Sequence, residues 1–177
     1  QISPRNKVNV FADTQSYQVR GYPGNNAPEA QTVWRFWPNG LYQGTWTSPV
    51  TNKFLLEAGF SFAQNGYPYK RVGQVTDIFG FDVKETDISI LETTTGLRYN
   101  AKGGLSGLDG YANVNQQDRY VQRFSASYVT GSHAFKAGFQ LQEGILNQDS
   151  IYNQDIEYNF VNSQPSTILQ WTTPYQN

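Results

Sequence analysis

The chain has 177 residues and a net charge of −1, and its charged fraction of 15% lies well below the roughly 25% of ordinary soluble domains. It contains no cysteine, which excludes disulfides, thiolate metal sites and a cysteine nucleophile. The near-neutral charge, without any basic stripe, argues against nucleic acid as a partner.

The composition leaves two kinds of β protein open. Aromatic residues make up 15% of the chain, which suits an outer-membrane barrel and equally a soluble carbohydrate-binding β-sandwich. The longest apolar runs, such as Phe54-Leu55-Leu56, are far shorter than the ~20 residues of a membrane helix. Any membrane-spanning part must therefore consist of strands. The chain begins with Gln1 and has no methionine, so we expect a fragment of a larger protein.

The first half of the chain alternates apolar and polar residues at the period of a half-buried strand. The expected strands are Val8–Asp13, Val33–Trp37, Leu41–Thr47 and Phe54–Phe62. The last of them has the length that a tilted membrane strand needs, about nine residues. Because proline cannot donate to a central ladder, Pro38-Asn39-Gly40 is expected to interrupt the sheet.

The second half centres on a hairpin over Arg123–Gln142, whose two arms alternate about the turn Thr130–His133. Phe124, Ala126 and Tyr128 fall on one face of the first arm. Four further strands are expected at Asp87–Glu92, Leu97–Ala101, Ile156–Phe160 and Thr167–Thr172.

The connections between these strands alternate in length. Short ones are expected at 48–53, 93–96, 130–133 and 162–165, and long ones at 15–30, 65–85, 102–118 and 144–154. Outer-membrane barrels alternate short periplasmic turns with long extracellular loops, whereas a sandwich has no reason to do so. The sequence therefore predicts an all-β protein, an antiparallel up-and-down meander of about nine strands that forms part of a large outer-membrane β-barrel and occupies residues 1–177.

Two segments also carry a family resemblance. LYQGTWTSPVTNKFLLEAGFSF (41–62) and RFSASYVTGSHAFKAGFQLQEG (123–144) resemble the barrel of TonB-dependent outer-membrane receptors, in particular the Oar-like receptors with a carboxypeptidase-regulatory-like domain. The resemblance covers nearly the whole chain and implies part of a plugged barrel of roughly 22 strands. The plug, the TonB-contacting segment and the N-terminal domain of that family have no counterpart in this sequence.

The resemblance implies a role in energy-coupled uptake of a bulky nutrient at the outer membrane of a Gram-negative bacterium. The expected partners are outer-membrane lipid, the TonB complex through the missing plug, and an extracellular ligand such as an oligosaccharide, a peptide or a metal chelate. Two alternatives stay open, namely the soluble carbohydrate-binding sandwich and a passive porin or adhesin barrel.

No catalytic chemistry is expected. His133 is the single histidine and lies in a tight turn, where no cleft shelters a nucleophile. One histidine without cysteine also argues against a transition-metal site, and no cofactor is expected.

The ligand-binding candidates are aromatic and cationic residues in and beside the long connections, where rings and cations can contact a ligand. They are Trp34, Arg35, Trp37, Tyr67, Tyr69, Lys70 and Arg71. The alternative is that these side chains pack loops against one another.

Overall fold

The computed structural model describes residues 5–20, 24–74, 80–104 and 110–172, and it divides into two compact units. Unit 1 consists of Gln1–Ser16, Trp37–Gly66 and Gln116–Asn147, and unit 2 of Tyr17–Phe36, Tyr67–Asn115 and Gln148–Asn177. The described residues are all-β apart from two short 3-10 turns, η1 (Pro28–Ala30) and η2 (Asn153–Asp155). No helix in this part of the chain has the length and apolar character needed to cross a membrane.

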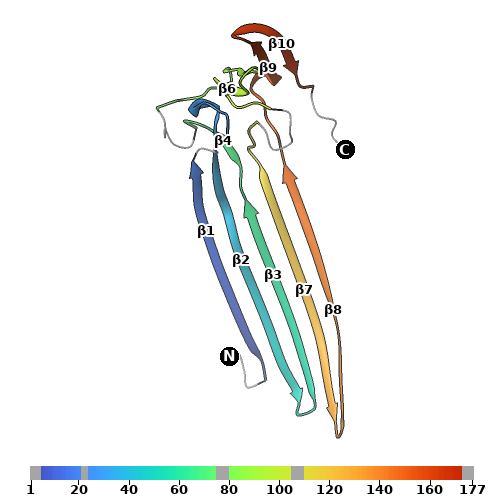
Figure 1. Ribbon diagram of the computed structural model, residues 1–177. Coiled ribbons are helices and arrows are strands. Elements are labelled where there is room, and N and C mark those ends of the chain that lie inside the picture. Colours follow the sequence, from blue (N-terminus) through green and yellow to red (C-terminus); the bar gives the residue numbers. More distant parts are fainter. Residues whose placement is uncertain (1–4, 21–23, 75–79, 105–109, 173–177) are drawn as a thin grey trace. The chain divides into compact units, whose positions relative to one another are not determined.

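Five long strands lie side by side in the order β1-β2-β3-β7-β8 (Figure 1). Their bounds are β1 (Lys7–Arg20), β2 (Thr32–Thr51), β3 (Phe54–Gly66), β7 (Asn115–Thr130) and β8 (His133–Gln148). β3 pairs antiparallel with both β2 and β7, and successive strands are neighbours, which confirms the predicted meander. β2 also pairs, near its start, with the short strand β4 (Tyr69–Arg71).

The long strands extend well beyond the alternating segments that predicted them. β1 continues to Arg20 through residues expected to form a loop, and β8 runs to Gln148. The expected interruption at Pro38 is wrong, because β2 is continuous through it and Asn39 lies opposite Asn65. The hydrogen bonds between paired strands join backbone groups and do not depend on the side chains. Polar residues can therefore extend a strand wherever the neighbouring strand offers backbone partners.

Four short strands form a separate sheet in unit 2, in the order β10-β9-β5-β6. They are β5 (Ser89–Glu92), β6 (Leu97–Tyr99), β9 (Ile156–Val161) and β10 (Gln164–Gln170). The alternating connection lengths predict that both hairpins continue the meander, but β5 instead pairs with β9 in parallel. A parallel pair needs a long crossover, and here the whole β7–β8 hairpin separates the two strands in the chain.

The buried hydrophobic core belongs to unit 2. Val33, Val72, Val83 and Ala101 form one cluster, and every fully buried hydrophobic side chain among the described residues lies in this unit. Among the described residues of unit 1, the long strands form a single layer, so their apolar side chains have no second layer within that unit to pack against. Unit 2 therefore buries hydrophobic side chains in a core, whereas many of those in unit 1 are exposed.

Candidate functional site

The long sheet has one apolar face. On β3, Phe54, Ala58 and Phe62 lie opposite Tyr128, Phe124 and Tyr120 of β7. On the other side of β3, Tyr42 and Trp46 of β2 lie opposite Phe62 and Ala58. Because directly opposed residues in an antiparallel pair share a face, these side chains form one surface.

Ring contacts across three strand pairs show that this face is continuous. Phe62 stacks on Tyr120 with ring centroids 4.7 Å apart and approaches Tyr42 at 5.9 Å, and Phe124 approaches Phe139 of β8 at 6.1 Å. Much of the face is nevertheless open, since Phe135 and Phe139 are 62% and 66% exposed. Exposed contiguous apolar surfaces typically mark contacts with a partner or a membrane.

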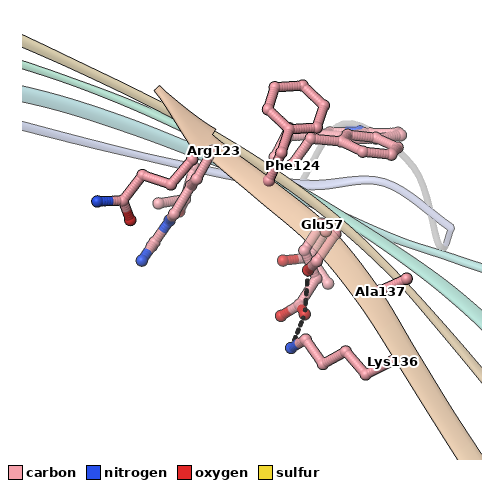
Figure 2. A pocket seen from close by; sticks show the side chains of 13 residues that line it. Glu57, Arg123, Phe124, Lys136 and Ala137 are labelled. Carbon is pink, nitrogen blue, oxygen red and sulfur yellow. Dashed lines mark hydrogen bonds and ion pairs between the residues drawn. The ribbon is translucent and has the colours of Figure 1, made fainter. Parts of the chain in front are cut away.

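The opposite face of the sheet is polar. Glu57 accepts hydrogen bonds from Lys136 Nζ (2.7 Å) and Ser125 Oγ (3.2 Å), which ties β3 to β7 and β8. Figure 2 shows Phe124 on the other side of the sheet from Glu57 and Lys136. The side chain of Arg123 lies across β3 at Gly59, where a Cβ atom would come within 2.6 Å of its Nε. A hollow of about 600 Å³ in this region is lined by Thr45, Glu57, Arg123 and Lys136 among others.

The predicted ligand-binding residues of unit 2 lie on two faces of the β2–β4 ladder. In the β2–β4 ladder, Trp34 lies opposite Tyr69, and Thr32 opposite Arg71, so these residues share one face. Lys70 lies opposite Val33, and the N–H of Arg35 donates to Pro68, so the two cations lie on the other face. Trp37, which is 47% exposed, belongs to unit 1 rather than to unit 2.

The aromatic members do contact one another. Trp34 lies 4.8 Å from Tyr69 and 6.3 Å from Tyr67 between ring centroids. Phe36 adds a fourth ring at 6.1 Å from Tyr67, and Tyr17 stacks on Phe36 at 4.1 Å. These last two rings were not among the predicted ligand-binding residues. Tyr17 lies in a segment expected to be a loop, and only its place in β1 brings it here.

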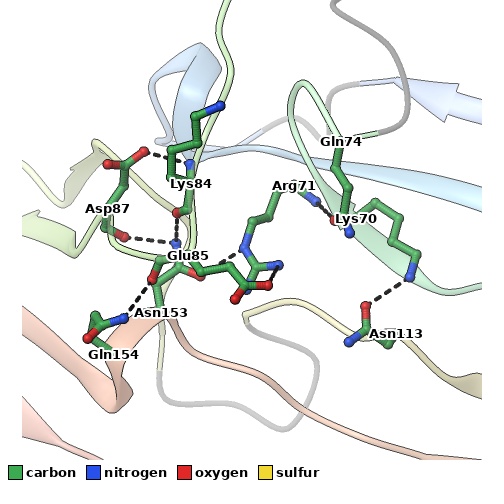
Figure 3. A network of polar contacts seen from close by, with 9 residues as sticks. All are labelled: Lys70, Arg71, Gln74, Lys84, Glu85, Asp87, Asn113, Asn153 and Gln154. Carbon is green, nitrogen blue, oxygen red and sulfur yellow. Dashed lines mark hydrogen bonds and ion pairs between the residues drawn. The ribbon is translucent and has the colours of Figure 1, made fainter.

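Arg71 is buried and makes its polar contacts with other residues of unit 2 (Figure 3). Its Nε donates to Asn153 Oδ1 (2.9 Å), its Nη1 lies 3.3 Å from Glu85 Oε1, and its guanidinium lies 4.8 Å from the ring centre of Tyr111. The same Asn153 donates to the backbone oxygens of Lys84 and Asp87. Burial raises the pKa of Tyr111 to about 12, so this ring is neutral beneath the cation. Arg71 thus joins β4 to the segments that carry Glu85 and Asn153.

Lys70 has a more open environment. Its Nζ donates to Asn113 Oδ1 (2.9 Å), and its pKa is lowered mainly by burial beside the Val33 cluster. Asp149 opposes this shift, whereas Arg71 and Arg35 add to it. Charges of both signs therefore act on Lys70, that of Asp149 most strongly.

Glu92 joins the two hairpin turns of the small sheet. Its Oε1 accepts from the N–H groups of Thr94 (3.0 Å) and Asn162 (3.1 Å), and its Oε2 accepts from the N–H of Ser163 (2.8 Å). These bonds, that of Ser163 first, lower the pKa of Glu92 from its ordinary 4.5.

We expect this turn contact to be sensitive to acid. Because the folded pKa lies below the unfolded value, the stabilisation is complete above about pH 4.5 and is lost as the pH falls through the folded pKa. Hydrogen exchange at the Ser163 amide should accelerate in that window beyond the intrinsic pH effect. Glu92→Gln should show faster exchange at neutral pH and no such transition. An unchanged transition in Glu92→Gln would assign it to another group.

The described residues were predicted to hold neither a metal ion nor a catalytic group, and the arrangement of their acidic and histidine side chains bears on the first of these. No group of three or more His, Cys, Asp or Glu among them is arranged to hold a metal ion. His133 is the first residue of β8 and is exposed, and its ring lies 6.3 Å from that of Phe135. No family model, curated protein or solved structure matches the chain.

Proposed function

We propose that this chain is part of the barrel of an outer-membrane receptor of the TonB-dependent type. Such a receptor takes up a bulky nutrient, and the TonB complex of the inner membrane supplies the energy. The observation that carries the proposal is the long single-layer sheet with one exposed aromatic face and one polar face. In a membrane barrel the apolar face contacts lipid and the polar face lines the lumen.

Strand length supports the same function. The five long strands contain 14, 20, 13, 16 and 16 residues. A tilted membrane strand needs about 9–11 residues, so each strand is long enough to cross the hydrocarbon core and continue beyond it. Tight turns join β2 to β3 and β7 to β8, whereas the opposite ends of these strands lead into unit 2.

The soluble sandwich accounts for the sheet less well. It requires the apolar residues of β3, such as Leu56 and Phe60, to pack face to face against Phe135 and Phe139 of β8. In the structure β3 and β8 are both neighbours of β7 in one sheet, and Ala58, Phe124 and Phe139 lie on the same face. Strands of one sheet lie side by side, so these residues do not face each other across a core.

The test is a spin-label scan along β8 of the protein reconstituted in lipid vesicles. Because the chain has no cysteine, single cysteines introduced at 135, 136, 139 and 140 can be labelled cleanly. We expect labels at Phe135 and Phe139 to collide with oxygen, which dissolves in lipid, and labels at Lys136 and Gln140 with a water-soluble nickel complex. Absence of this two-residue alternation would exclude a lipid-facing sheet. In cells, loss of the TonB complex should abolish uptake by the full-length receptor, whereas a passive porin would be unaffected.

A further inference from the structure

Two cations in unit 2 lie beside each other on one face of the β2–β4 ladder. Lys70 is opposite Val33, and Arg35 is opposite Pro68, two residues further along. Diagonal neighbours of this kind have Cα atoms roughly 7–8 Å apart, which is within reach of long side chains. One small ligand can therefore contact both cations at once.

The charges of this pair are not balanced within the described part of the chain. Lys70 donates to a neutral amide, that of Asn113, and no described residue accepts a hydrogen bond from the exposed side chain of Arg35. The neighbouring Arg71 lies on the other face and is paired with Glu85. Among the described residues, Asp149 is the carboxylate whose charge raises the pKa of Lys70, and it also accepts a hydrogen bond from the N–H of Val114. The direct hydrogen-bond partner of Lys70 is thus a neutral amide, and the Arg35 side chain has no acceptor among the described residues.

We propose that Arg35 and Lys70 together bind a phosphate group. A guanidinium presents five N–H donors and an ammonium three, of which Asn113 uses one, so several donors remain for a multi-oxygen anion. A dianion matches the two positive charges better than a single carboxylate does. This site is independent of the proposed transport function, because it rests only on the geometry of unit 2.

The experiment is a titration of the full chain in neutral-detergent micelles with inorganic phosphate, at low and constant ionic strength, followed by the amide NMR signals of β2 and β4. We expect saturable shifts in the wild-type protein and about tenfold weaker binding in Arg35→Gln and in Lys70→Gln, as for the loss of one charge-assisted contact. Lys84→Gln removes an exposed lysine that is paired with Asp82 and should bind phosphate as the wild type does. Unchanged spectra elsewhere in each variant show that the fold is intact.

A second arm distinguishes free phosphate from a lipid headgroup. Micelles doped with phosphatidic acid are compared with micelles doped with phosphatidylcholine, whose phosphate carries a quaternary amine. Saturation by inorganic phosphate supports a site for free phosphate groups, and saturation by phosphatidic acid alone supports a headgroup site. If neither probe binds, or if Lys84→Gln weakens binding as much as Arg35→Gln does, the proposal is overturned.

Discussion

If the apolar face contacts lipid, as proposed, replacing Phe139 with arginine is expected to destabilise the sheet in a bilayer by up to about 2–4 kcal/mol, the cost of a cation on the lipid face of a barrel. Phe139 is 66% exposed on the apolar face and contacts Phe124 there. The measurement is a urea titration of the protein in lipid vesicles, followed by tryptophan fluorescence.

The matched control is the next residue along β8. Gln140→Arg places the same side chain on the polar face, so its effect should stay within about 0.5 kcal/mol. Equal destabilisation by the two variants would mean that the faces do not differ in environment. That result would remove the main support for a lipid-facing surface.

Glu157→Gln should have the largest effect in unit 2, a loss of about 3–5 kcal/mol in the free energy of opening the small sheet. The side chain of Glu157 is 1% exposed, accepts from Arg98 Nε (2.9 Å), and accepts from Ser89 Oγ (2.8 Å). Removing the carboxylate charge leaves a largely buried guanidinium without its counter-ion. Hydrogen exchange of the β9 amides measures the opening of this sheet directly.

Two further variants separate the ion pair from the packing around it. Asp82→Asn breaks the exposed pair with Lys84 and should cost under about 1 kcal/mol. Replacing both Arg98 and Glu157, by Met and Leu, should recover most of the stability lost in Glu157→Gln, because a well-packed apolar pair needs no charge compensation. A double variant as unstable as Glu157→Gln would show that the unpaired charge of Arg98 does not determine the loss.

Local patterns predicted the parts of the fold in which consecutive residues alternate between two environments. The alternation over Arg123–Gln142 located the β7–β8 hairpin, and that over Phe54–Phe62 located most of β3. The same patterns underestimated strand length, since the polar ends of β1 and β8 are held by backbone hydrogen bonds to their neighbours rather than by burial.

Local patterns also failed to predict which of the candidate ligand-binding residues lie together. Composition singled out aromatic and cationic residues near 34–37 and 67–71, and the structure does bring Trp34, Tyr67 and Tyr69 together. It also directs Arg71 into a bond with Asn153, 82 residues away, and separates it from Arg35 and Lys70. No local spacing predicts such a contact.

By itself, then, the sequence determined the class of structure, an all-β chain whose strands each carry an apolar and a polar face, because the side-chain period of two is a property of the extended backbone. Only the tertiary structure decided which strands share a sheet. The parallel pairing of β5 with β9 and the contact of Arg98 with Glu157, 59 residues apart, depend on the long β7–β8 hairpin that intervenes between them. Pairing between distant strands is selected by the fit of whole faces and buried partners, and no short window of sequence contains that information.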